Sequence, residues 1–477
     1  MEDCKHRPQK TCIVTFDQPL FIIACEIVAG NDNMNNVVVR LGGFHTLMSF
    51  LGAIGYIMNG SGLEDIWSTV YAEEPVKNMM SGKAFSRSLR AHILTYTAIG
   101  MYFTEYVSDD MNLSDKQKIH SFLRDHLESW ETNPPRYNDF DDSVLNELRV
   151  NLLNALDSLK SNGPTAQLFI QYFDMVTIAL QFIEAERLGN WELHLQSIEK
   201  MIPYFHASGH YLYAKSAQIY FQAMVKLEVT MDDQEYVRFT EEGGFTIRRS
   251  FKAWSGIWSD MTIEQTLNRF FGTDLKHGRG VTPSVVARYL TCMPVSFAVM
   301  DGLESYCDLS FSTSEQHIDL TNSRLKKDNN DLMLMYNWIL AHKPFEHRES
   351  LTSLSTGIVG GENINCHEAL KLGTLSMGAM IGKNAQNVSM CFKYEVKPLS
   401  TAKAGIHADV KYANLNPMML FQRICVLTKD DEDLTKKAFS HELSPFPLSL
   451  FDQEGFMRKN KKSELFSVFK TSLQSDS

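Results

Sequence analysis

The stretch VVVRLGGFHTLMSFLGAIGYIM, residues 37–58, decides the fold of this 477-residue chain. Its first three residues, Val37–Val39, are β-branched and show no polar alternation, which predicts a strand buried on both faces. Gly42-Gly43 lets the backbone turn sharply, and the apolar residues after it predict a helix over 46–58. The stretch therefore predicts a buried strand that passes directly into a core helix of a soluble intracellular protein.

Residues 41–63 also have to be weighed as a membrane span, because they contain no Asp, Glu, Lys or Arg. Their continuous helical part, 46–58, reaches only ~20 Å, whereas the apolar core of a bilayer is about 30 Å thick. The polar N-terminus, MEDCKHRPQK, does not fit a secretory signal. We therefore expect no membrane contact and a nuclear or cytoplasmic location.

The composition is that of a globular protein, with 44% hydrophobic and 22% charged residues, enough for two or three cores. The net charge of −11 disfavours attraction of nucleic acid to the whole surface and leaves room only for a local basic face. The eight cysteines form no CxxC pair, so we expect buried reduced thiols rather than a disulfide framework or a zinc site.

The segment before the opening stretch completes a strand–helix–strand unit. CIVTF, residues 12–16, is rich in β-forming residues, and Leu20–Val28 has the apolar spacing of a helix. From Leu63 to Gly243 the pattern is almost wholly helical, with breaks at Gly163-Pro164 and Ala207–Gly209. The predicted class is therefore α/β with dominant helix content.

These patterns divide the chain into four parts. We assign 1–62 to the first part of an α/β core and 63–243 to a helical insertion. Residues 244–343 return to the core and contain a basic and aromatic segment. Residues 344–477 form a mixed C-terminal region that is expected to be truncated.

Two weak motifs are set aside. Residues 378–384, GAMIGKN, are one residue short of a phosphate loop, and Asn384 stands where Ser or Thr binds magnesium. His206 and His210 have the spacing of zinc ligands on one helix, but Ser208-Gly209 interrupts it. We interpret the histidine pair as part of a turn between two helices.

The segment 245–288 is basic and aromatic. Seven basic residues outnumber three acidic ones there, and Trp254, Trp258, Phe270 and Phe271 are interleaved. Such a mixture suits contact with the backbone and bases of nucleic acid; the alternative is a solvated basic face over an aromatic core stripe. The basic residues are Arg248, Arg249, Lys252, Arg269, Lys276, Arg279 and Arg288.

Four residues that could carry acid or metal chemistry lie at the ends of predicted elements. Asp17 follows a strand, His45 follows the Gly-Gly turn, and Asp260 and Glu264 are four apart, so they can share one helical face. Converging carboxylates could hold two magnesium ions for phosphodiester chemistry. The alternative gives Asp260 a helix-capping role and Glu264 a surface position.

Several segments together resemble a multi-copy, uncharacterised group of transposon-derived animal proteins, similar to DDE-type transposases. The resemblance covers most of the chain. The segments are TFDQPLF (15–21), VVVRLGGFHTLMSFLGAIGYIMNGSGLEDIW (37–67), HYLYAKSAQIY (210–220), FTIRRSFKAWSGIWSDMTIEQTLNRF (245–270) and SLFDQEGFMRKNKKSELF (449–466).

The resemblance implies a ribonuclease-H-like core interrupted by a large all-helical insertion. It assigns Asp17 as the first acid and Glu264 as the last, both as magnesium ligands, with His45 after the second. The second acid would stand three residues before His45, where this chain has Gly42. Because two-metal chemistry needs each charged ligand, the resemblance implies an inactive relic that binds DNA.

Two other functions remain open. The chain could be a helical scaffold that binds a protein partner without catalysis, which predicts dispersed acids and an exposed apolar patch on helices 143–227. It could also be an active magnesium-dependent nuclease or transposase, which needs a third carboxylate, for which Asp65, Asp260 and Asp301 are candidates.

Overall fold

The computed structural model describes most of the first 402 residues and a short piece beyond them. The chain divides into two compact units, Met1–Ala402 and Lys403–Ser477. The described residues are 10–110, 116–118, 143–246, 321–384, 394–402 and 432–440, with single positions in 121–124 and 282–306. In the second unit the described part is α19, Glu432–Ala438.

A parallel strand–helix–strand unit opens the fold, as the sequence predicts. Strand β1, Cys12–Phe16, pairs in parallel with β2, Val37–Leu41, in a register that places Phe16 beside Leu41. Helix α2, Gln18–Ala29, connects them through a short 3-10 turn, η1, Asp32–Met34. Among the described residues these two strands form the one sheet.

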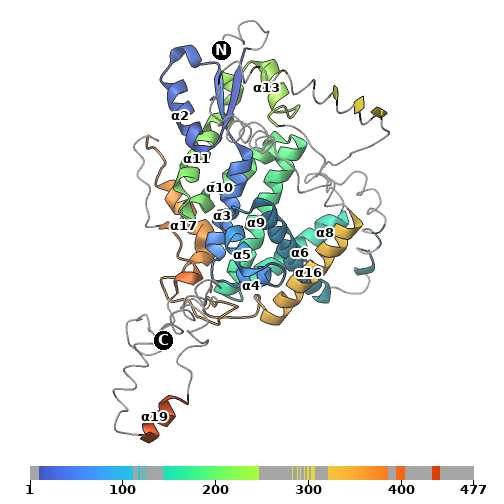
Figure 1. Ribbon diagram of the computed structural model, residues 1–477, viewed down its shortest axis with the longest axis vertical. Helices are drawn as coiled ribbons and strands as arrows, with labels where there is room; N and C mark the ends of the chain where they lie inside the picture. Colours follow the sequence, from blue (N-terminus) through green and yellow to red (C-terminus); the bar gives the residue numbers. More distant parts are fainter. Residues whose placement is uncertain are drawn as a thin grey trace, which may run out of the picture. The chain divides into compact units, whose positions relative to one another are not determined.

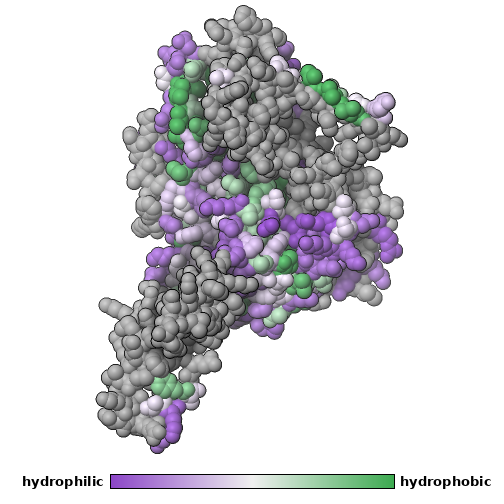
Figure 2. Space-filling model, viewed as in Figure 1, coloured by the Kyte–Doolittle hydropathy of each residue, from purple (hydrophilic) through white to green (hydrophobic). Residues whose placement is uncertain are grey.

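Helix α2 packs on both strands with one face and leaves an apolar face in solvent. Phe21 is fully buried, whereas Leu20, Ile23 and Ile27 are 52%, 51% and 54% exposed. Figure 2 shows this apolar surface over α2 at the upper left. The face therefore lies on the outside of the fold.

Helix α3, Gly43–Met58, follows β2 directly and is almost entirely buried. Helix α5, Glu73–Met80, crosses α3 at Gly55. A Cβ on Gly55 would lie 1.9 Å from the carbonyl oxygen of Met80. The predicted strand–turn–core helix is confirmed, and the small residue is explained by this close approach of two backbones.

The body of the first unit is a bundle of helices with α9 at its centre (Figure 1). Helix α9 contacts α3, α6, α8 and α10. The helices are α4 Leu63–Ser68, α6 Phe85–Asp110, α8 Ser143–Lys160, α9 Pro164–Leu188, α10 Trp191–Ala207, α11 Tyr211–Val225, α12 Leu227–Thr230 and α13 Asp233–Phe239.

Later parts of the chain complete this bundle. Helix α16, Asn322–His342, packs on α6, and α17, Ala369–Gly378, preceded by η5, Cys366–Glu368, packs on α10. The segment 394–402, with η8 at Leu399–Thr401, is held by backbone bonds: Val396 N–H donates to the Ala207 carbonyl and Ser400 N–H to that of Asn59.

The fold class is thus confirmed at a coarse level: the described chain is mostly helical, with a small parallel sheet. Helix α9 is long and apolar enough to cross a membrane by length and composition, but 72% of its most apolar stretch is buried inside the bundle. Core helices of globular proteins share this property.

Candidate functional site

The carboxyl edge of the parallel pair brings two of the predicted site segments together. The N–H of Gly42, just after β2, donates to the carbonyl of Phe16, the last residue of β1, over 2.8 Å. Asp17 and the Gly42–His45 turn therefore start side by side. In open α/β sheets this edge is where ligands bind.

Asp17 has a structural role that explains its position. It is the N-cap of α2, and its exposed carboxylate accepts a hydrogen bond from the Leu20 N–H over 3.4 Å. An aspartate at this position satisfies one of the free N–H groups of the first helical turn. The chain following β1 therefore uses its acid to start a helix.

His45 lies half-buried in the first turn of α3, with its ring packed edge-on against Phe44. The turn before it is tight: the Thr46 hydroxyl donates to the Gly42 carbonyl over 2.8 Å. Gly42 has no side chain, so this position contributes no ligand.

A different carboxylate approaches this edge, that of Glu186 from α9. A Cβ built on Gly43 would lie 3.1 Å from its Oε1. The same oxygen lies 2.7 Å from Nη2 of Arg40 on β2 and 3.0 Å from Nδ1 of His194 on α10. The side chains of these three residues are at most 9% exposed. The end of β2 thus rests on a buried charged cluster.

The charges of this cluster follow from its surroundings. Burial alone would raise the pKa of Glu186, but Arg40 and His194 outweigh it and hold that pKa below its usual value. Burial lowers the pKa of His194 despite the attraction of Glu186. The cluster is therefore an Arg–Glu ion pair beside a neutral imidazole.

Two aromatic residues close the cluster. Nε2 of His194 lies 3.0 Å from the Tyr220 hydroxyl. The guanidinium of Arg40 lies over the ring of Phe245, 5.3 Å from its centroid. We call Arg40, Glu186, His194, Tyr220 and Phe245 the Arg40 cluster. It anchors the chain just before the basic segment.

The described residues do not fit a magnesium site. Asp17 caps a helix, Gly42 offers no oxygen from a side chain, and Glu186 is neutralised by Arg40. In the described part of the chain no group of three His, Cys, Asp or Glu side chains is placed to hold a metal ion. A hard divalent cation needs several oxygen ligands.

The remaining predicted site residues lie outside the described residues. These are Glu264, the last predicted acid, and the six predicted nucleic-acid contacts Arg248, Arg249, Lys252, Arg269, Lys276 and Arg279. Their roles stay predictions.

The interpretation of His206 and His210 as part of a helix hairpin is confirmed. Helix α10 ends at Ala207, Gly209 has a φ of +73°, and α11 begins at Tyr211. His206 is fully buried and contacts the Ser376 hydroxyl of α17 over 3.1 Å, and burial lowers its pKa to about 4. It is a core residue.

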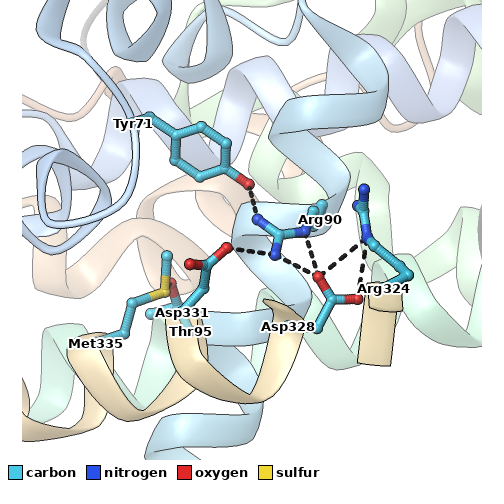
Figure 3. Close-up of polar contacts among 7 residues, drawn as sticks. All are labelled: Tyr71, Arg90, Thr95, Arg324, Asp328, Asp331 and Met335. Atoms are coloured by element: carbon cyan, nitrogen blue, oxygen red, sulfur yellow. Dashed lines mark hydrogen bonds and ion pairs between the residues drawn. The ribbon is translucent and has the colours of Figure 1, made fainter. Parts of the chain in front are cut away.

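A second charged cluster joins α6 to α16 (Figure 3). Arg90 on α6 donates to Asp328 and, over 2.5 Å, to Asp331, both on α16, and also to the Tyr71 hydroxyl. Arg324, in the preceding turn of α16, pairs with Asp328. Burial alone would lower the pKa of Arg90. Its hydrogen bonds to Asp331, Tyr71 and Asp328 outweigh burial and hold that pKa above its usual value. We call these residues the Arg90 cluster.

Neither cluster was predicted from the sequence, although the Arg40 cluster left a signal there. Arg40 is the single charge in the apolar run VVVRL, and Glu186 stands in the last turn of a helix that is otherwise apolar on most sides. A charge inside such a run has to find a partner when it is buried. The partner itself, 146 positions away, could not be found from spacing.

Comparison with known proteins gives a family without an assigned activity. The model of a domain of unknown function, DUF8702, matches residues 1–442. The chain belongs to this family. No curated protein and no solved structure is significantly similar to it.

Proposed function

We propose that this chain is a transposase-derived nucleic-acid-binding protein with a degenerate metal site. The observation that carries the proposal is the shared carboxyl edge of β1 and β2, with Asp17 after one strand and Gly42 after the other. In the DDE-type transposases that the chain resembles, acids near the ends of neighbouring parallel strands bind the metal ions, and Gly42 would occupy the place of the second acid.

The same edge argues against retained catalysis. Two-metal hydrolysis or strand transfer needs carboxylates free to bind both ions. The Asp17 carboxylate accepts a hydrogen bond from the Leu20 N–H as a helix cap, and the buried carboxylate that approaches this edge, Glu186, is bound by a guanidinium. If the protein were active, it would be a magnesium-dependent DDE-type enzyme, with Glu264 as the remaining acid.

Nucleic-acid binding is assigned to the segment after Phe245. Phe245 is 4% exposed and packs against Trp191 and His194 as well as Arg40. The segment that carries Arg248 and Arg249 therefore starts from a fixed point on the body. Anchoring reduces the conformational entropy lost when the segment binds a ligand. Such a role fits a nuclear or cytoplasmic protein.

A DNA mobility shift with the full chain at about 50 mM salt tests the proposal. We expect binding by the natural sequence and a loss of at least about tenfold in affinity for Arg248→Glu/Arg249→Glu. The matched control is Lys326→Glu/Lys327→Glu on α16, two exposed positions with the same change in charge, and it should keep most of the binding. No shift at low salt would overturn the proposal.

The same samples report on catalysis. We expect supercoiled plasmid to stay intact when magnesium is added. Nicking that requires magnesium and disappears in Asp17→Asn would show that the site is intact and that the protein is an enzyme.

A helical interaction scaffold is the second candidate, and the exposed apolar face of α2 supports it, although this face lies outside the helices 143–227 where the sequence predicted the patch. It predicts no DNA binding at any salt concentration and a stable complex with a protein. The mobility shift therefore separates the two functions.

A further inference from the structure

The outer edge of β1 offers hydrogen-bonding groups to a further strand. Cys12 N–H donates to Asn36 and the Phe16 carbonyl accepts from Gly42, so residues 12, 14 and 16 point their backbone groups at β2. Residues 13 and 15 alternate with them and point outward. Within the described chain no backbone bond reaches the outward groups of Ile13 and Thr15.

Between Cys12 and Phe16 this edge carries no lysine, proline or bulge, which are features that discourage pairing in natural edge strands. Strand β1 reads CIVTF, and Thr15 is exposed. The pairing edge ends at Thr11, where the N–H donates to Glu235 of α13 over 2.9 Å. Ile13 and Thr15 are therefore available to pair with a further strand, each through one backbone N–H donor and one carbonyl acceptor.

Helix α2 adds an apolar flank on the same side. It contacts α11 through Gln18 and Phe21, and α11 also packs on β2. At 100° per residue, Leu20, Ile23 and Ile27 share the face of α2 roughly opposite to α11. The apolar face thus points away from the β2 side of the unit, toward the side on which β1 has its outer edge.

We propose that this edge pairs with β1 of a second copy of the chain, antiparallel about a twofold axis at Val14. In that register Ile13 lies opposite Thr15 of the partner, and Thr15 opposite its Ile13. Both outward residues then form hydrogen-bonded pairs, and the two Val14 residues form the central pair without backbone bonds. Self-complementarity of this kind is what a twofold interface demands.

The helix spacing agrees with the strand spacing. Helix α2 lies over β1 and β2, so the two copies of α2 in a continuous four-stranded sheet would be two strand spacings apart, about 9.6 Å. Packed helices have axes about 8 to 10 Å apart. Pairing of the strands would therefore bring the two apolar faces of α2 into contact.

The predicted dimer is weak. Strands of five residues and helices of twelve are expected to bury less than roughly 1,200 Å² in total, the low end of specific interfaces. We expect a dissociation constant in the micromolar range. The inference does not depend on nucleic-acid binding, and its failure would leave that proposal intact.

Sedimentation equilibrium of the full chain from about 1 to 100 µM tests the dimer. Ile23→Lys/Ile27→Lys should weaken self-association at least about tenfold. The control Val225→Lys/Val229→Lys, at apolar positions 57% and 88% exposed on α11 and α12, should change it by less than about twofold. Both variants alter exposed positions and should fold.

Cross-linking tests the register. In a background that lacks the eight native cysteines, mild oxidation should link two copies through Val14→Cys, because the central pair faces itself. Thr15→Cys faces Ile13 of the partner and should link poorly. A monomer at every concentration, equal linking of both variants, or an edge that binds only other peptides would overturn the proposal.

Discussion

The Arg40 cluster and the Arg90 cluster are both built around a buried arginine in the same helical body, but they are enclosed differently. In the first, the guanidinium of Arg40 meets the carboxylate of Glu186 among the described residues, and no side chain of Arg40, Glu186 and His194 is more than 9% exposed. In the second, Arg90 meets two carboxylates that are 16% and 13% exposed, and Arg324 adds a second positive charge. The first cluster therefore depends on its exact pairing, whereas water can replace a lost partner in the second.

Loss of Glu186 should have the largest effect. Glu186→Leu leaves Arg40 buried without its carboxylate, which costs about 3 to 5 kcal/mol of unfolding free energy. Urea denaturation at pH 7 measures it. Arg40→Met/Glu186→Leu removes both charges and should recover most of the loss. If Glu186→Leu alone lowered the free energy of unfolding by less than about 1 kcal/mol, the cluster would have to be hydrated.

Loss of Arg90 should lower the free energy of unfolding by less, about 2 kcal/mol, because water can hydrate the carboxylates of Asp328 and Asp331. In Arg90→Met we expect faster amide hydrogen exchange in α16 and unchanged exchange in α9. The control Arg324→Met removes a side chain that is 28% exposed and should cost less than about 1 kcal/mol. Equal effects of the two variants would contradict the difference in enclosure.

Acid should destabilise the helical body of the first unit through its buried histidines. Burial lowers the pKa of His92 to about 3 and that of His206 to about 4, and it lowers that of His194. The unfolded chain therefore binds more protons, and stability falls as the pH drops below about 6.5.

At pH 5 the lowered pKa of each of His92 and His206 should reduce the free energy of unfolding by up to about 2 kcal/mol. His92→Gln should flatten this pH dependence in urea titrations at pH 7 and 5, whereas His347→Gln, at an exposed position, should not. A steeper dependence in His92→Gln would show that the assigned direction is wrong.

The smallest effect is expected at Gly43. A Cβ there would lie 3.1 Å from the Glu186 carboxylate, so Gly43→Ala should displace it slightly and cost about 1 kcal/mol. Gly361→Ala, which would meet no atom within 4 Å, is the control. Equal stabilities in thermal unfolding would mean that the carboxylate moves freely.

What could be predicted from the sequence was local. CIVTF, VVVRL and the Gly-Gly turn specify the β–α–β unit and α3 because strand propensity, apolar pattern and turn chemistry agree within a few residues. The start of helix α16 at Asn322 could not be predicted, because its first turns, NSRLKKDNN, are polar and show no apolar period.

The site was predicted less well. Asp17 was assigned as a metal ligand, although an aspartate two residues before proline at a helix start is a capping signal. The Arg40–Glu186 and Arg90–Asp328 pairs join residues 146 and 238 positions apart, and such contacts are set by tertiary packing. The ribonuclease-H-like core and Glu264 remain predictions.

The salt dependence of DNA binding tests the central claim most directly. We predict that the full chain binds DNA at about 50 mM salt, with or without magnesium, and that its affinity falls steeply by about 200 mM. In Arg248→Glu/Arg249→Glu the slope of log affinity against log salt should be smaller by roughly two. Absence of binding at low salt, or a slope unchanged by the two substitutions, would contradict the account.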